Sequence, residues 1–137
     1  MDIKSSPDFI TELKPNQVFV FGSNLAGIHG AGAALQAIQF GAVRGVGVGL
    51  CGQTYAIPTK DKYINTLPLS GIRKYVDEFI RCALHSELEF LVTPIGCGLA
   101  GYEPKDIAPM FKDCLDLDNV FLPKGFLLVY KNTGLQS

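Results

Sequence analysis

The chain of 137 residues has no tryptophan, only two histidines, and four cysteines without CxxC spacing. So few ligands, spread as Cys51, Cys82, Cys97, Cys114, His29 and His85, do not suggest a metal site, and none is expected. Reduced thiols fit a cytoplasmic protein. No run of about 18 apolar residues occurs and the first residues lack a signal-peptide core, so no membrane segment is expected.

An excess of charge of one sign is also missing. Twelve Lys and Arg oppose thirteen Asp and Glu, giving a net charge of −1, and no block of like charges stands out. Proteins that bind a phosphate backbone carry a basic surface, so direct nucleic-acid binding is not expected. With 47% hydrophobic and 18% charged residues, the sequence predicts one folded domain over residues 1–137. The oligomeric state stays open.

Glycine, in contrast, is abundant, with 15 residues, and it gathers in two loops that each follow a strand-like run. The first loop, residues 22–33, follows the run 17–21, and the second, residues 96–102, follows the run 90–95. Glycine exposes backbone amides and reaches positive φ at low cost. Such loops at the ends of strands bind phosphorylated ligands in α/β sheets. Two in one chain predict a diphosphate held from both sides, with tight turns as the alternative.

Two common nucleotide-binding motifs are absent. The pattern Gly30-Ala31-Gly32 would need a third glycine where Leu35 stands, so it is not a GxGxxG motif. No GxxxxGK[ST] segment exists either. The sequence therefore predicts neither a dinucleotide-binding Rossmann domain nor a P-loop NTPase.

The order of apolar patterns predicts alternating strands and helices. Expected strands are 17–21, 54–57 (ending at Pro58), 90–95, 119–122 and 125–130, and expected helices are 33–40, 69–85 and 104–115, with a short turn or helix near 7–13 and an irregular segment at 41–53. This alternation is typical of an α/β fold whose mostly parallel or mixed sheet lies between helical layers.

Three short motifs in a fixed order resemble the macrodomain superfamily, which binds ADP-ribose. They are Gly30-Ala31-Gly32-Ala33-Ala34 preceded by His29, the segment Tyr55-Ala56-Ile57-Pro58-Thr59-Lys60, and Pro94-Ile95-Gly96-Cys97-Gly98-Leu99-Ala100. Specifically, the chain is similar to the branch that contains the terminal ADP-ribose protein glycohydrolase, and to small macro-like proteins of bacteria and phages. The resemblance, over roughly residues 17–115, implies a three-layer α/β/α macrodomain-like fold with a mixed central sheet.

The resemblance also implies a ligand, ADP-ribose or a related NAD-derived nucleotide, and no cofactor. The implied ligand-binding residues are Gly22, Ser23, Asn24, Gly30, Ala31, Gly32, Ala33, Gly96, Cys97, Gly98, Leu99, Ala100, Gly101 and Tyr102. Asn24 would hydrogen-bond the distal ribose, and the glycine loops would enclose the diphosphate with their amides. Tyr102 would stack on the ligand or pack within its loop.

Catalysis is where this chain departs from that branch. There, a lysine attacks the anomeric carbon of the ribose and an aspartate in the second glycine loop assists. Lys60 matches the lysine, but Ala100 stands in place of the aspartate and cannot transfer a proton. Asp61 and His29 are further candidates for acid or base, each with a plain loop role as the alternative. Two functions stay open: a binding module with weak or no hydrolysis, and an ADP-ribosyl hydrolase that uses Lys60.

Overall fold

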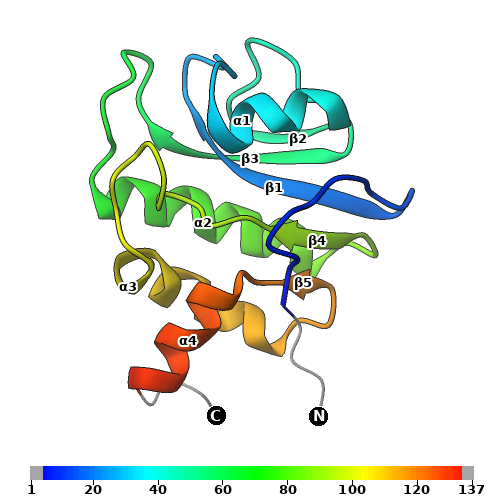
Figure 1. Cartoon of the computed structure of the whole chain (residues 1–137), viewed down its shortest axis with the longest axis vertical. Helices are drawn as coiled ribbons and strands as arrows, with labels where there is room; N and C mark the ends of the chain where they lie inside the picture. The colour runs from blue at the N-terminus through cyan, green and yellow to red at the C-terminus, as the bar shows by residue number, and fades with distance from the viewer. Residues whose placement is uncertain (1–4, 134–137) are drawn as a thin grey trace.

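A mixed five-stranded sheet organises residues 5–133, the part of the chain that the computed structural model describes (Figure 1). Its strands lie in the order β2 (Gly49–Cys51), β3 (Thr54–Lys60), β1 (Gln17–Asn24), β4 (Glu89–Val92) and β5 (Val120–Phe121). All neighbouring strands are parallel except β2 and β3, which are antiparallel. The sheet is therefore mixed, as the sequence predicts.

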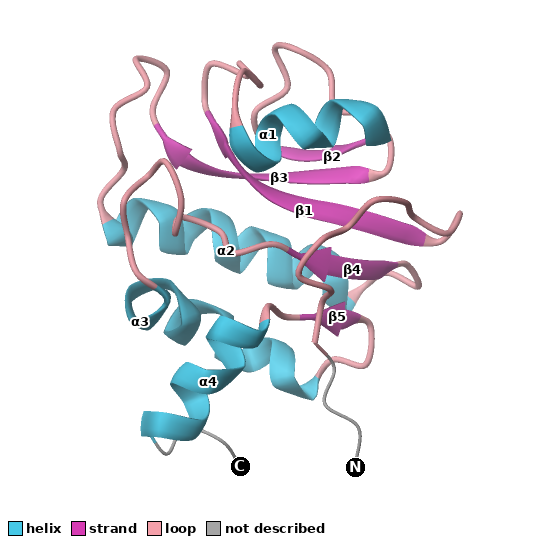
Figure 2. Ribbon diagram, viewed as in Figure 1, coloured by secondary structure: helices cyan, strands magenta, loops and turns pink. Residues whose placement is uncertain are grey.

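Helices cover both faces of this sheet (Figure 2). They are α1 (Gly32–Ala37) with the 3₁₀ turn η1 (Ile38–Phe40), α2 (Leu69–Leu84), α3 (Pro104–Ile107), the 3₁₀ segment η2 (Ala108–Asp116) and α4 (Lys124–Thr133). In Figure 1, α1 lies on one side of the sheet, and α2, α3 and α4 lie on the other. The three-layer α/β/α arrangement is confirmed.

The two cores explain why β1 is apolar throughout. Val18 and Val20 face the core beneath α2 and η2, whereas Phe19 and Phe21 face the core beneath α1. All four side chains are at most 2% exposed. A strand that is buried on both faces reads as a continuous apolar run, and this run fixes β1 at the centre of the sheet.

The clearest predicted helix is confirmed with nearly the same bounds. Ile72, Val76, Phe79 and Ala83 are buried on one face of α2, at the spacing of three and four residues that the sequence shows. His85 follows as its C-terminal cap. The shorter helix after the first glycine loop also ends where predicted, because Gly41 has φ +111° and closes η1.

One predicted strand is wrong. Residues 125–130 lie in α4, not in a strand. Phe126 and Tyr130 are four residues apart, so in a helix both reach the same core, where both are at most 2% exposed. The hydroxyl of Tyr130 also donates to the carbonyl of Ala108 at 2.5 Å, which fixes α4 against η2.

Prolines move two other boundaries. Strand β3 continues through Pro58 to Lys60, and the pairing with β1 shifts beside it, between Ser23 and Asn24; a strand tolerates proline at such irregularities. The α-helix expected over 104–115 ends at Ile107 and continues as 3₁₀ helix, because Pro109 has no amide hydrogen to donate.

The N-terminal segment forms no helix near residues 7–13. Instead, Ser6 extends the sheet edge: its amide donates to the carbonyl of Leu122 at 2.8 Å, and its hydroxyl to that of Val92 at 2.7 Å. Within residues 5–133, every helix is too short or too polar to cross a lipid bilayer.

Candidate functional site

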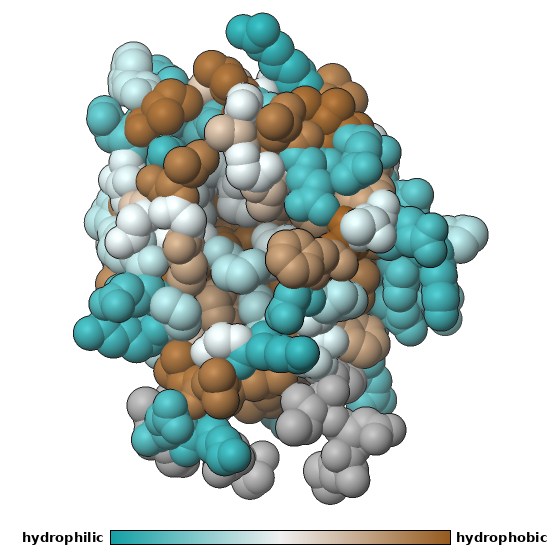
Figure 3. Space-filling view, in the orientation of Figure 1, coloured by the Kyte–Doolittle hydropathy of each residue, from teal (hydrophilic) through white to brown (hydrophobic). Residues whose placement is uncertain are grey.

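A pocket of about 670 Å3 opens at the carboxyl ends of β1, β3 and β4. These three strands are parallel, so the loops that follow them meet at one edge of the sheet. Figure 3 shows a hollow in the upper left of the molecule, surrounded by weakly polar and hydrophobic residues. Its volume lies within the range of about 300–1,000 Å3 that is typical of small-molecule sites.

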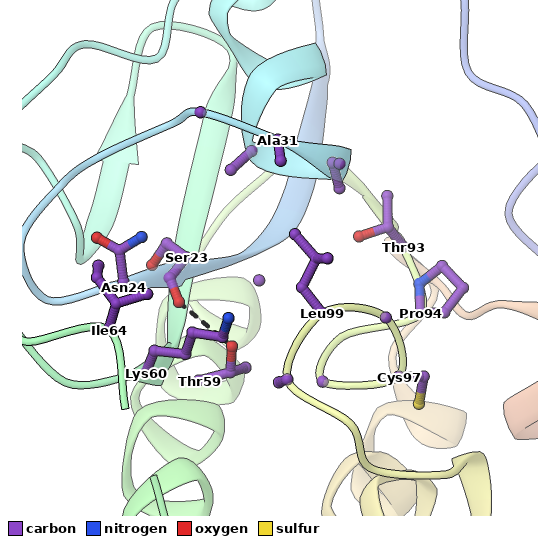
Figure 4. Close-up of a pocket in the computed structure, with 18 of the residues that line it drawn as sticks. Ser23, Asn24, Ala31, Thr59, Lys60, Ile64, Thr93, Pro94, Cys97 and Leu99 are labelled. Carbon is purple, nitrogen blue, oxygen red and sulfur yellow. Dashed lines mark hydrogen bonds between the residues drawn. The ribbon is translucent and has the colours of Figure 1, made fainter. Parts of the chain in front are cut away.

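Both glycine-rich loops line this one pocket. Of the residues named from the sequence, the lining includes Gly22, Ser23, Asn24, Gly30, Ala31, Gly32, Ala33, Lys60, Gly96, Cys97, Gly98, Leu99 and Ala100. His29, Asp61, Gly101 and Tyr102 lie outside the lining. The two loops approach each other where the Leu99 side chain reaches toward α1: its Cδ1 lies 3.7 Å from the position of a Cβ on Gly32 (Figure 4).

The first loop is held in shape by its own polar groups. The Asn24 side chain donates from Nδ2 to the carbonyl of Ile28 at 2.8 Å and accepts from the amide of Ile28 at 3.0 Å. Gly27 has φ +72°, and a Cβ there would lie 2.5 Å from the backbone of Gly45. The loop therefore requires glycine at that position, and Asn24 retains only part of its hydrogen-bonding capacity for a ligand.

The second loop leaves several backbone amides without a partner. Cys97 donates to Pro94 at 3.1 Å, and Tyr102 donates to Gly96 at 2.9 Å, which curls the loop. Within residues 5–133, the amides of Gly98, Leu99 and Ala100 make no backbone hydrogen bond. Consecutive free amides in a curled loop form an anion-binding concavity, and the space beside the Cα of Gly98 is empty to 4 Å.

Lys60 is the charged side chain in the lining, which contains no aspartate, glutamate or histidine among the described residues. Figure 4 shows it extending beside Thr59 toward the middle of the pocket. None of the ion pairs found within residues 5–133 includes Lys60. The pocket thus offers one ammonium group and many amides, which together suit an anionic ligand.

Asp61 is occupied in the turn that follows β3. Its carboxylate accepts hydrogen bonds from the amides of Tyr63 at 2.8 Å and Asn65 at 3.0 Å. These bonds are typical of an aspartate that closes a turn. Its carboxylate therefore shapes the loop beside Lys60 in this structure.

His29 is buried beneath the first loop. Its Nε2 lies 3.1 Å from the carbonyl oxygen of Val43, and its ring stands edge-on to Phe21, with centroids 5.5 Å apart. Because a carbonyl can only accept, Nε2 carries the proton of this hydrogen bond. Nδ1 is buried without a partner in the described residues. The ring therefore faces the core, away from the pocket lining.

Cys97 contributes a protonated thiol. Burial, followed by the charges of Asp106 and Glu103, raises its pKa to about 11. Its Sγ lies 3.4 Å from the carbonyl oxygen of Ile95, and Figure 4 shows it directed away from the middle of the pocket. A thiol of this kind is a poor nucleophile near neutral pH, because the thiolate is the reactive form.

Tyr102 and Thr66 connect the loops after β3 and β4. The hydroxyl of Tyr102 donates to the carbonyl of Leu67 at 2.8 Å, and that of Thr66 to the carbonyl of Ala100 at 3.1 Å. Tyr102 therefore packs within the loop pair in this structure and does not line the pocket.

Sequence reasoning missed several lining residues. They are Ile28, Ala34, Thr59, Ile64, Thr93 and Pro94. Thr59 lies near the end of β3, and Thr93 directly follows β4. Their positions at the carboxyl ends of these strands could have indicated them as lining residues. Ile64 carries no such signal, because only the structure shows how the turn after β3 directs it.

A second, smaller hollow of about 110 Å3 adjoins the pocket and shares Thr93 and Pro94 with it. Phe19 and Ile10 supply apolar walls, and Asp8, whose carboxylate lies 4.0 Å from the ammonium of Lys124, supplies a charged edge. The two hollows therefore meet at Thr93 and Pro94, and the second adds apolar walls and an acidic edge.

These layers, with a glycine-lined pocket at the strand ends, define a three-layer α/β/α fold. The arrangement is similar to the solved macrodomain of Mycobacterium tuberculosis DarG, with a TM-score of 0.64 over 87% of this chain and 96% of that chain. The two sequences are 22% identical over this match. No family model and no curated protein matches the sequence. The chain has the macrodomain fold.

Proposed function

We propose that this chain binds ADP-ribose, or a closely related NAD-derived nucleotide, as a binding module with weak or no hydrolysis. One observation carries the proposal: the loops after β1 and β4, both rich in glycine, line a single pocket. Free amides of Gly98, Leu99 and Ala100 suit the oxygens of a diphosphate. The macrodomain fold supports the same ligand class.

The two adjoining hollows suit the order of groups in that ligand. The diphosphate would occupy the middle, between the two glycine loops, with Lys60 nearby to offset its charge. A flat base with an exocyclic amine suits the second hollow, where the exposed Pro7 offers apolar contact and Asp8 a carboxylate acceptor. The distal sugar would then lie at the opposite end, beside Asn24.

The composition of the lining favours binding over hydrolysis. General acid or base catalysis contributes typically about 10²–10⁴-fold and needs a titratable group within hydrogen-bond reach of the reacting atoms. The described lining has no carboxylate or imidazole, and Ala100 stands where the resemblance places the assisting aspartate. A ligand held here would meet little assistance for bond cleavage.

A second function is favoured by one side chain. Lys60 extends into the pocket and has no ion-pair partner within residues 5–133. An amine in that position could attack the anomeric carbon of a ribose that is linked to an acceptor, provided that the amine loses its proton. The bond to the acceptor would break, the acceptor would leave with a proton, and water would then release ADP-ribose from the lysine. The alternative is therefore an ADP-ribosyl glycohydrolase that uses Lys60.

Calorimetry with ADP-ribose tests the proposed binding. We expect heat of binding with the unaltered chain and none with Gly98→Val, which would fill empty space in the pocket without a clash at Cβ. Gly125→Val is the matched control, because it makes the same change in α4, where a Cβ would meet only Pro104 at 3.8 Å. Absence of heat with the unaltered chain at millimolar ADP-ribose would overturn the proposal.

Release of ADP-ribose from glutamate-linked and nucleic-acid-linked substrates separates the two functions. We expect slow or no release by the unaltered chain. Rapid release that is lost in Lys60→Ala would establish the glycohydrolase instead. Rapid release that persists in Lys60→Ala would move the chemistry to other groups, with Asp61 and His29 the next to be replaced.

A further inference from the structure

Ile64, in the loop after β3, has the strained backbone of the site. Its φ is +67°, and it is the one residue other than glycine with positive φ among residues 5–133. A β-branched side chain in this region is unusual and costs free energy, since Cβ crowds the backbone. Strain of this kind persists where neighbouring contacts enforce it, and it is often found at ligand sites.

The turn around Ile64 supplies those contacts. The amide of Ile64 donates to the carbonyl of Asp61 at 3.1 Å, and the amide of Asp61 donates to the carbonyl of Asn65 at 2.8 Å. The Asp61 carboxylate accepts from the amides on either side of Ile64. The turn is thus closed from both sides, and Ile64 cannot leave the left-handed region without breaking it.

The strained backbone directs an apolar side chain to the pocket. Ile64 lines the pocket and remains 41% exposed, although a residue at the tip of a polar turn could point into solvent. Figure 4 shows it beside Asn24, with Lys60 on the same side of the pocket. An apolar group, an amide and an ammonium therefore meet at one end of the site.

We propose that Ile64 is the specificity-determining residue for the distal sugar of a nucleoside diphosphate sugar. The inference rests on the proposed function and deepens it. A sugar ring has hydroxyls at its edge and carbon–hydrogen bonds on its faces. Asn24 and Lys60 would address the edge, and Ile64 packs against one face. The strained turn keeps Ile64 in place before the ligand arrives, so that little ordering is needed on binding.

A comparison of ADP-ribose with ADP, which lacks the distal sugar, tests this inference by calorimetry. Both Ile64→Ala and Ile64→Gly should weaken ADP-ribose by about tenfold, the effect of losing most of one aliphatic contact. ADP should bind all variants within about twofold of the unaltered chain, because it does not reach Ile64. Ile38→Ala is the control, since Ile38 is 49% exposed and lies outside the lining.

Thermal unfolding tests the strain separately. Ile64→Gly should melt at a higher temperature than Ile64→Ala, because only glycine adopts positive φ without strain. A melting temperature of Ile64→Gly equal to or below that of Ile64→Ala would overturn the inference.

The binding outcomes also separate this inference from the proposed function. If the unaltered chain binds no ADP-ribose, the proposed function itself fails. If it binds ADP-ribose and ADP equally, or if the Ile64 variants keep their preference for ADP-ribose, only the role of Ile64 is overturned. Equal weakening of both ligands would likewise overturn it, because Ile64 would then support the loop as a whole.

Discussion

The hydroxyl of Tyr102 lies 2.8 Å from the carbonyl oxygen of Leu67, to which it donates a hydrogen bond. This bond joins the loop after β4 to the loop after β3, and the Thr66 hydroxyl makes a second connection to Ala100. Two of the three loops around the pocket are therefore tied together by hydrogen bonds in which only Ala100 belongs to the lining. We therefore expect this support to hold the free amides of the second glycine loop in position.

Loss of the Tyr102 bond should affect both stability and binding. Tyr102→Phe should lower the free energy of unfolding by about 1 kcal/mol, the usual net value of one hydrogen bond. It should also weaken ADP-ribose, because a looser loop must be ordered when the ligand binds. Denaturant unfolding and calorimetry measure the two effects.

Tyr130→Phe is the matched control for Tyr102→Phe. It removes another tyrosine–carbonyl hydrogen bond, to Ala108 in the core of the helical layer. This control should lose stability and keep its ADP-ribose affinity. An unchanged affinity in Tyr102→Phe as well would show that the connection between the loops plays no part in binding.

Replacement of Asn24 should also have a double effect. Asn24→Ala removes both side-chain hydrogen bonds to Ile28, so we expect a loss of about 1–2 kcal/mol in the free energy of unfolding. We further expect ADP-ribose to bind about 1–3 kcal/mol more weakly, because sugar hydroxyls lose a partner. Calorimetry and thermal melts test both. A lower melting temperature with unchanged affinity would limit Asn24 to its structural role in the loop.

Addition of a carboxylate at Ala100 should bring out hydrolysis. Ala100 lines the pocket on the side of Lys60, because its carbonyl accepts from the Thr66 hydroxyl and Thr66 pairs with Lys60 in an isolated bridge. The resemblance to the glycohydrolase branch places the assisting aspartate at this position. Ala100→Asp should therefore raise the rate of ADP-ribose release by up to about 10²–10⁴-fold, the range for general acid or base catalysis. Ala100→Asn is the control of similar size without a titratable group. Equal rates in the two variants would mean that the missing carboxylate does not limit the reaction.

Stability should fall at alkaline pH. Burial raises the pKa of Cys97 to about 11 from an ordinary value of 9.0, and that of Tyr55 to about 12 from 10.0; burial also raises the pKa of Cys82 and of Tyr130. Because these groups release protons more easily when unfolded, the unfolded state binds fewer protons above about pH 9, and folding weakens as pH rises from there to about 12.

Melting curves between pH 8 and pH 12 measure this alkaline effect. The decline should begin near pH 9, where the unfolded Cys97 thiol titrates. Cys97→Ala should reduce the loss of stability between about pH 9 and 11, since it removes one of the shifted groups. A flat profile over this range would contradict the assigned burial of these groups.

Local patterns predicted much of the fold but not every element. The continuous apolar run of β1 fits a strand that is buried on both faces. The apolar residues of α2, spaced three and four apart, fit a helix that is buried on one face. Residues 125–130 were ambiguous, because a short apolar run fits a strand as well as a buried helix. The four-residue spacing of Phe126 and Tyr130 was the available helix signal, but it becomes decisive only beside η2.

The candidate site was predictable where it depends on backbone and less so where it depends on side-chain direction. Glycines after two strands indicated the loops that line the pocket. No local pattern shows that the His29 ring turns toward Phe21, or that the Asp61 carboxylate closes its own turn. Ile64 reaches the pocket through a positive φ, which isoleucine disfavours. Backbone propensity therefore could not have predicted its place in the lining.

The free amides of the second glycine loop have a consequence for how the site tolerates mutation. A backbone amide belongs to every residue type except proline, so most substitutions at Leu99 would leave the donor in place and change only the shape around it. Leu99→Pro, in contrast, would delete a donor while adding no charge and little bulk. In a scan of all substitutions along this loop, ligand affinity should therefore depend on whether the new residue is proline and on the size of its side chain. The polarity of the side chain should have little influence.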